Sequence, residues 1–262
     1  MPNDALLHTI ETNGTAVVTL NRPKLHNAFD DELIARLTTL FHELASNDEV
    51  RVVLLAANGK SFSAGADLNW MRRMAAYSEE ENYQDAMRLA DMLRTLNTLA
   101  KPTIALVHGA TFGGGVGLVA CCDMVLAAPQ ASFSLSEVKL GIIPSVISPY
   151  VVSAIGERMS RHYLLTAERF SAEEALRIQL VHELVEQDQL RSRADEIAAV
   201  LKNNGPSALR ECKDLIRLVA RGSVDREMIE ETARRIARIR ASGEGQEGLG
   251  AFLEKRKPNW IS

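Results

Sequence analysis

The chain has few cysteines, few aromatic residues and little excess of either charge sign. Its three cysteines, two of them adjacent at Cys121 and Cys122, cannot build a disulfide framework, so we interpret the pair as small buried apolar side chains. The formal net charge of −4 argues against the basic surface that nucleic-acid binding requires. No apolar run reaches the roughly 18 residues of a membrane-spanning helix. We therefore expect a globular protein that binds neither nucleic acid nor membrane.

The amino-terminal segment, MPNDALLHTIETNG, lacks the features of a targeting sequence. It has neither the basic region nor the apolar core of a secretory signal peptide, and its early acidic residues are unlike a transit peptide. Together with the cysteine content, this predicts a reducing, cytoplasmic location.

The apolar pattern predicts alternating strands and helices, followed by a region that is helical almost throughout. Asn13-Gly14 predicts a hairpin, and continuous apolar runs at 50–57 and 103–108 predict strands buried on both faces. Ser78 opens a long helix as part of a capping box. Ser148 and Pro149 predict another helix start, with a stop at Gly156. The fold class is therefore α/β with a largely parallel sheet.

A glycine-rich stretch, GATFGGGVGLVACCD, runs from Gly109 to Asp123 between a predicted strand and a predicted helix. The segment SFSAGADL follows the strand at 50–57 in the same way. Two helix starts that face one point would offer two free N–H groups to a negatively charged oxygen, as in an oxyanion hole. A phosphate cradle and close helix–strand packing are alternatives, although the spacing matches neither a phosphate loop nor a dinucleotide fingerprint.

Glu137 follows a short predicted strand and precedes three apolar residues, Leu140, Ile142 and Ile143. A carboxyl group in apolar surroundings has a raised pKa and can act as a general acid or base. The alternative is an exposed loop glutamate, free or paired with Lys139.

These motifs occur in one order along the whole chain. FSAGADL, HGATFGGGVGL, FSLSEVKLGIIP and LTAERFSAEEALRIQLVHELV are flanked by LNRPKLHNAF and GLGAFLEKRKP. Together they resemble the crotonase superfamily of enoyl-CoA hydratases and isomerases. The resemblance implies a spiral of ββα units with the CoA and catalytic site over residues 1–200. It also implies a helical trimerisation region over 201–262 and a homotrimer or dimer of trimers.

The resemblance also assigns roles to single residues. The backbone N–H groups of Ala66 and Gly114 would hold the thioester oxygen, Glu137 would move protons, and Asp67 would be a turn and cap residue. Contacts to substrate or CoA fall on Lys24, Leu25, His26, Ser63, Ala64, Ala66, Asp67, Leu68, Gly114, Gly117, Phe252 and Lys255, the last two often reaching from a neighbouring subunit. It implies no metal and no cofactor besides the CoA thioester substrate.

The chain departs from the two-glutamate hydratases at Gly117, where they carry their first glutamate. Glu137 could serve both roles, another group could supply the second, or the chain could be a single-base isomerase or a catalytically silent CoA-binding homologue. SAGADLNWM and SEVKLGIIPSVISPYV resemble bacterial methylglutaconyl-CoA and isohexenylglutaconyl-CoA hydratases, which favours hydration of a branched glutaconyl-type CoA such as 3-methylglutaconyl-CoA. Arg72 and Arg73 are candidates to bind its distal carboxylate, or they form a solvated helix face.

Overall fold

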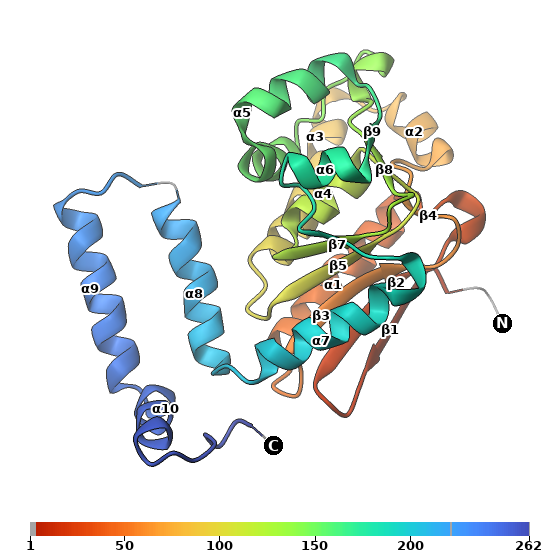
Figure 1. Ribbon diagram of the computed structural model, residues 1–262. Coiled ribbons are helices and arrows are strands. Elements are labelled where there is room, and N and C mark those ends of the chain that lie inside the picture. Colours follow the sequence, from red (N-terminus) through yellow and green to blue (C-terminus); the bar gives the residue numbers. More distant parts are fainter. Residues whose placement is uncertain (1–3, 221, 262) are drawn as a thin grey trace.

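The computed structural model describes residues 4–220 and 222–261, which form two β-sheets surrounded by helices (Figure 1). The larger sheet has the strand order β1-β2-β3-β5-β7-β10, and every neighbouring pair except β1 with β2 is parallel. Its strands are β1 (Leu6–Ile10), β2 (Thr15–Leu20), β3 (Val52–Ala57), β5 (Thr103–Val107), β7 (Met124–Ala127) and β10 (Glu183–Leu184). The predicted hairpin is confirmed, and Gly14 adopts a φ of +80° there.

A second, smaller sheet has the order β4-β6-β8-β9. Its strands are β4 (Ser61–Ser63), β6 (Ala110–Phe112), β8 (Ser132–Ser134) and β9 (Phe170–Ser171). The strands β4, β6 and β8 follow β3, β5 and β7 along the chain, and helical segments follow each of them. This repeated strand–strand–helix order confirms the predicted spiral of ββα units.

Ten α-helices lie in the described residues, and those that follow the strands of the core cover both faces of the larger sheet. They are α1 (Asp31–Ser46), α2 (Leu68–Met74), α3 (Glu79–Asn97), α4 (Gly114–Cys121), α5 (Ser148–Thr166), α6 (Ala172–Arg177), α7 (Leu190–Lys202), α8 (Pro206–Val219), α9 (Arg226–Ala241) and α10 (Gly243–Leu253). Along β3, Val52 and Leu54 pack with residues of α7, whereas Val53 and Leu55 join the main core with residues of α1 and α3. The continuous apolar run of β3 is therefore explained by burial on both faces.

Two helix boundaries test the capping predictions. The capping box at the start of α3 is confirmed, because Ser78 Oγ accepts from the Glu81 N–H and the Glu81 carboxylate accepts from the Ser78 N–H. The cap predicted at Ser148 is wrong. Its hydroxyl donates to the Ser145 carbonyl over 2.8 Å, and no side chain caps α5. The stop predicted at Gly156 is confirmed, because this residue has non-helical backbone, with φ 72° and ψ 162°, and divides α5 into two helical segments at a kink.

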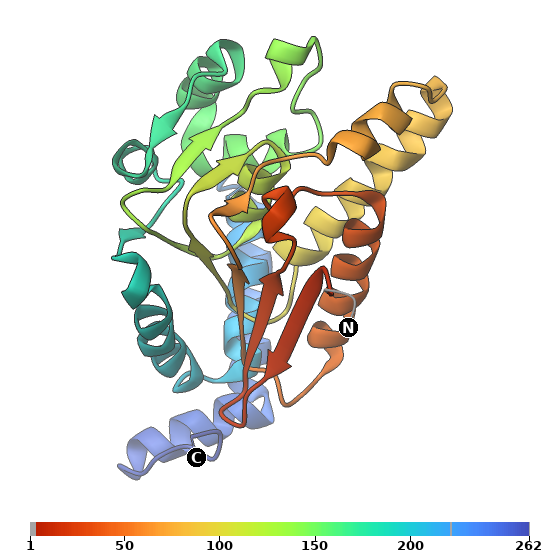
Figure 2. The same cartoon turned by 90° about the vertical axis from the view of Figure 1, so that its right-hand side faces the viewer.

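The last three helices extend away from the two sheets (Figure 1), and α10 is also clear of the sheets in the second view (Figure 2). None of the described residues of α8 and α9 is buried. The first of these helices is tied to the sheet by Lys213, whose Nζ lies 2.6 Å from Asp123 Oδ2 and donates to the Lys101 carbonyl. In the residues that the structure describes, no helix is long and apolar enough to cross a membrane.

Candidate active site

The glycine-rich stretch forms a tight turn from β6 into α4. Gly113 has a φ of +50° and precedes the helix without a side-chain cap. A Cβ on Gly115 would lie 2.6 Å from the Ser63 carbonyl oxygen, so close packing accounts for that glycine. The Gly114 N–H, by contrast, has no acceptor among the described residues. Close packing and a free donor therefore coexist in the same turn.

The second loop presents a similar free donor. Gly65 has a φ of +98°, and the Asp67 side chain caps α2 by accepting from the N–H groups of Asn69 and Trp70. Phe29 holds this loop from both sides, since its N–H donates to the Gly65 carbonyl over 2.8 Å and its carbonyl accepts from the Asp67 N–H over 2.7 Å. The Ala66 N–H lies between these two bonds and finds no acceptor in the described part of the protein.

Arg22 fixes this arrangement and was not predicted from the sequence. Its guanidinium contacts Asp30 at 2.7 Å and Asp67 at 3.3 Å, and donates to the Ala28 carbonyl at 2.8 Å. The Arg22 and Asp67 side chains are 16% and 8% exposed, so the pair is largely shielded from water. Because Asp67 lies far along the sequence from Arg22, no local pattern could reveal the contact.

Three segments of the chain meet at Gly113. A Cβ built on this glycine would lie 3.0 Å from Glu137 Oε1 and 4.0 Å from Gly65 Cα. The Glu137 carboxyl group is therefore beside the turn that carries the free Gly114 N–H and the loop that carries the free Ala66 N–H. Two fixed donors next to an acid or base can stabilise a negative oxygen while a proton moves on the adjacent carbon.

Glu137 begins a short 3₁₀ helix, Glu137–Leu140. Its Oε2 is buried and has no hydrogen-bond partner within the described chain, and burial raises the pKa of this carboxyl group. The expectation that Leu140, Ile142 and Ile143 surround it is wrong, because these side chains are 60%, 54% and 72% exposed. The carboxyl group lies instead beside Gly113 and the loop that carries Gly65.

The two segments expected to contact CoA lie together. The Ala64 N–H donates to the His26 carbonyl over 3.0 Å, and His26 Nδ1 lies 3.0 Å from Ser61 Oγ. Lys24 and Leu25 belong to the 3₁₀ helix Pro23–Leu25 and are exposed. The Ser63 hydroxyl donates to the Asn27 carbonyl over 2.9 Å and is buried. Leu68, just beyond the Ala66 loop, is 69% exposed.

The four other candidates, Arg72, Arg73, Phe252 and Lys255, are exposed. Phe252 on α10 is 80% exposed, and α10 lies at the opposite end of the molecule from α2 in both views (Figure 1, Figure 2). Lys255 follows α10 in the sequence and is also exposed. Arg73 pairs with Asp31, and Arg72 donates to the Asn69 side chain over 2.8 Å. Both arginines are exposed, as expected of a solvated helix face.

Gly117 has no space for a side chain. A Cβ at this position would lie 2.4 Å from Ile147 Cγ2 and 3.7 Å from Leu93 Cδ1. Ile147 is 3% exposed and belongs to the main core. The volume that a glutamate at 117 would need is therefore filled with apolar atoms.

This packing predicts the effect of a single methyl group. We expect Gly117→Ala to lower the free energy of unfolding by about 1–2 kcal/mol, because overpacking outweighs the gain in helix propensity. The change should cost less in an Ile147→Ala background, where the methyl group has room. Urea unfolding of the two single variants and the double variant measures this coupling. Strict additivity would show that Ile147 does not limit the space at 117.

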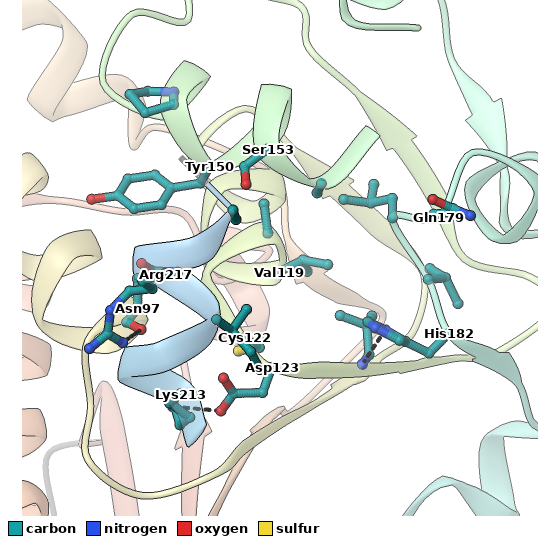
Figure 3. Close-up of a pocket in the computed structure, with 18 of the residues that line it drawn as sticks. Asn97, Val119, Cys122, Asp123, Tyr150, Ser153, Gln179, His182, Lys213 and Arg217 are labelled. Atoms are coloured by element: carbon teal, nitrogen blue, oxygen red, sulfur yellow. Dashed lines mark hydrogen bonds and ion pairs between the residues drawn. The ribbon is translucent and has the colours of Figure 1, made fainter. Parts of the chain in front are cut away.

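A separate cavity lies elsewhere in the described part of the chain. It has a volume of about 710 Å³ and lies between α8 and the helices α4, α5 and α6 (Figure 3). Asp123 and Lys213 are ion-paired in its wall, and His182 Nδ1 accepts from the Val125 N–H over 3.1 Å. Burial lowers the pKa of His182. None of the catalytic candidates lines this cavity, so it is separate from the site at Gly113.

Metal-binding residues do not gather anywhere in the described part of the chain. No three or more His, Cys, Asp or Glu side chains there are placed to hold a metal ion. The buried thiols of Cys121 and Cys122 have raised pKa values, about 12 for Cys122, as expected of inert core residues.

Comparison with known proteins gives a consistent result. The family model described as enoyl-CoA hydratase/isomerase matches residues 11–262. A putative enoyl-CoA hydratase of Thermus thermophilus is 34% identical over 96% of this chain and 99% of its own length. The crotonyl-CoA hydratase of Syntrophomonas wolfei is 33% identical over 94% of each chain. The crystal structure of an enoyl-CoA hydratase from Shewanella pealeana superposes with a TM-score of 0.96 and 46% identity, over 99% of this chain and 97% of that one.

Proposed function

Because the chain belongs to the enoyl-CoA hydratase/isomerase family, the crotonase superfamily, we propose that the Ala66 and Gly114 amides hold the thioester oxygen of its substrate. The chain is an enoyl-CoA hydratase-type lyase. One observation carries the assignment of the site. Glu137 Oε1 would lie 3.0 Å from a Cβ on Gly113, immediately before the free Gly114 N–H.

The proposed reaction adds water across the α,β double bond. When the water oxygen bonds to the β-carbon, the electron pair of the double bond moves toward the thioester and forms an enolate. The two N–H groups stabilise the enolate oxygen, which carries more negative charge than the substrate carbonyl. Glu137, whose pKa is raised by burial, gives a proton to the α-carbon, while the attacking water loses one proton to a general base, so that H and OH add across the double bond.

The remaining contacts are proposed from position. Main-chain groups of Lys24, Leu25 and His26, together with Ser63, Ala64, Asp67 and Leu68, would contact CoA beside the Ala66 loop. Gly117, behind the Gly114 turn, would support the acyl side. The exposed Phe252 and Lys255 would reach the nucleotide end from a neighbouring subunit, where a cation suits phosphate. The thioester activates its own α-carbon, so the proposed reaction needs no separate cofactor.

Within this chemistry we propose a branched glutaconyl-type CoA, such as 3-methylglutaconyl-CoA, as the substrate. The support is the resemblance of SAGADLNWM and SEVKLGIIPSVISPYV to hydratases of that class. The relatives reported above are named for crotonyl-CoA or for enoyl-CoA in general. Arg72 and Arg73 already have partners on the surface of α2, so neither is placed to bind a distal carboxylate without moving.

A single absorbance assay separates the candidate functions. Hydration of crotonyl-CoA or 3-methylglutaconyl-CoA lowers the absorbance of the conjugated thioester. A single-base isomerase acting on a β,γ-enoyl-CoA would raise it, and a silent CoA-binding homologue would leave it unchanged. We expect a fall with both substrates and a higher kcat/KM for 3-methylglutaconyl-CoA. Faster turnover of crotonyl-CoA would refute the glutaconyl assignment alone.

We propose that residues 1–200 form the catalytic core and 201–262 the assembly region of a homotrimer or dimer of trimers. Apolar side chains on the last three helices support this, since Ile216, Ile229, Leu249 and Phe252 are half or more exposed. Static light scattering at micromolar concentration should give three or six times the chain mass. A stable monomer would contradict the proposed assembly.

The free cysteines fit a reducing, cytoplasmic location.

A further inference from the structure

A buried carboxylate on α3 has no role in the site described so far. Asp85 is 4% exposed, and it is the first buried residue of α3. Its Oδ1 lies 2.7 Å from Nη2 of Arg88, whose side chain is 53% exposed. A charged side chain in a protein core is costly unless it is paired, and Arg88 is the partner of Asp85. The carboxylate of this pair is buried, whereas the arginine side chain is exposed.

The helix register gives the position of Asp85 along the axis of α3. Asp85, Leu89, Met92 and Leu96 follow the spacing of one helix face, and the last two are fully buried in the main core. Both α3 and α4 lead into the amino ends of the parallel strands β5 and β7, so the two helices run in the same direction. Leu93 Cδ1 lies 3.7 Å from the position of a Cβ on Gly117, which aligns these two levels.

This alignment gives the position of Asp85 along the helix axis relative to the first residue of α4. At 1.5 Å per residue, Asp85 lies about 12 Å before Leu93 along α3, and Gly114 lies about 4–5 Å before Gly117 along α4. Measured along the shared direction of the two helices, the level of Asp85 is therefore about 7 Å beyond the amino end of α4, the end from which its free N–H groups point. A thioester oxygen held at Gly114 would place the α- and β-carbons of an acyl group in that interval.

We propose that Asp85, positioned by Arg88, is the second carboxylate of the site and takes the proton of the attacking water. The proposal rests on the hydratase function proposed above. Ile147 occupies the space in which a carboxylate at 117 would lie, so position 117 cannot supply this function. In this proposal α3 supplies it through Asp85.

The proposed step balances without any further reactant. The water oxygen bonds to the β-carbon while its proton passes to the Asp85 carboxylate. The double-bond electrons move onto the thioester oxygen and return to form the bond between the α-carbon and the proton from Glu137. Asp85 then releases its proton to solvent, and Glu137 regains one.

Two reactions of the same chain test this division of roles. Hydration of an enoyl-CoA needs both carboxyl groups, whereas exchange of the α-protons of butyryl-CoA in D₂O needs only Glu137 and the two amides. We expect Asp85→Asn to lower kcat for hydration by about 10²–10³-fold and to leave the exchange rate within about threefold of the wild type. Glu137→Gln should lose both reactions.

The matched control is Asp91→Asn on the same helix. Asp91 forms an i,i+3 contact of 3.7 Å with Arg94, as Asp85 does with Arg88, but its side chain is 55% exposed. This variant should hydrate and exchange like the wild type. If Asp85→Asn does not fold, Asp85→Ala with added formate replaces it, and recovery of hydration by formate supports the proposal.

The contrary outcomes are distinct from one another. Hydration by Asp85→Asn within threefold of the wild type, or no recovery of Asp85→Ala by formate, overturns the role of Asp85. Equal loss of hydration and exchange overturns it as well, because Asp85 then supports the whole site and not the water step. A wild-type chain that exchanges but hydrates no enoyl-CoA overturns the proposed function itself.

Discussion

Glu137→Gln should lower kcat by about 10²–10⁴-fold, because it removes the group that transfers a proton to and from the α-carbon. The amide keeps the shape of the carboxyl group but cannot ionise. The two N–H donors lie on other segments, at Ala66 and Gly114, so the Kd for a product acyl-CoA should change only a few-fold. Steady-state kinetics and isothermal titration of the same preparation measure both effects. Near-normal kcat would assign the α-proton to a different residue.

The free energy of unfolding of the same variant should also depend on pH differently from that of the wild type. Burial raises the pKa of Glu137 in the folded chain, so the ionised form is penalised there. This penalty is present above the folded pKa and absent below the unfolded value, since protonation favours the folded state. Glu137→Gln lacks the penalty, so it should be more stable than the wild type at pH 8, with the difference vanishing as the pH falls toward 4. Equal stability at pH 8 would contradict the burial of this group.

Gly114→Pro should lower kcat by about 10²–10³-fold, the cost of removing one oxyanion donor. Proline has no N–H, yet it is tolerated in the first turn of a helix, and Gly114 is the first residue of α4. The fold should therefore survive while the donor is lost. The measurement is kcat for crotonyl-CoA, with circular dichroism to confirm the helix content.

The control for this variant is Gly114→Ala, which keeps the N–H. A Cβ at this position would lie 3.2 Å from the Phe29 ring, so both variants add similar crowding. We expect the alanine variant to keep most of its activity. If alanine and proline reduce kcat equally, crowding against Phe29 and not the missing donor explains the loss.

The sequence predicted the site to the extent that local patterns encode it. Each of these features produces a local sequence pattern: the helix starts, the glycines with positive φ, and the buried strand at 52–57. The predicted cap at Asp67 is confirmed, because an aspartate before a helix binds the first free N–H groups. The second sheet was harder to predict from the sequence. Its strands have only two or three residues, too few to show an alternation of apolar and polar side chains.

Other features depend on contacts between distant segments. The clamp of Arg22 on Asp67 and the packing of Ile147 against Gly117 join residues that no local spacing connects. The exposed side chains of Leu140 and Ile143 show the same limit, because apolar residues next to a carboxylate in sequence need not surround it in space. Asp85 lies on a helix of mostly charged and apolar residues, where one buried carboxylate gives no distinct pattern.

A crystal structure of the chain with a bound acyl-CoA tests the central claim most directly. The account predicts that the thioester oxygen lies within hydrogen-bond distance, about 2.7–3.1 Å, of both the Ala66 and the Gly114 nitrogen atoms. It also predicts that the α-carbon faces Glu137. A thioester group bound instead in the cavity of about 710 Å³ between α8 and the core, or one whose oxygen contacts neither amide, would contradict it.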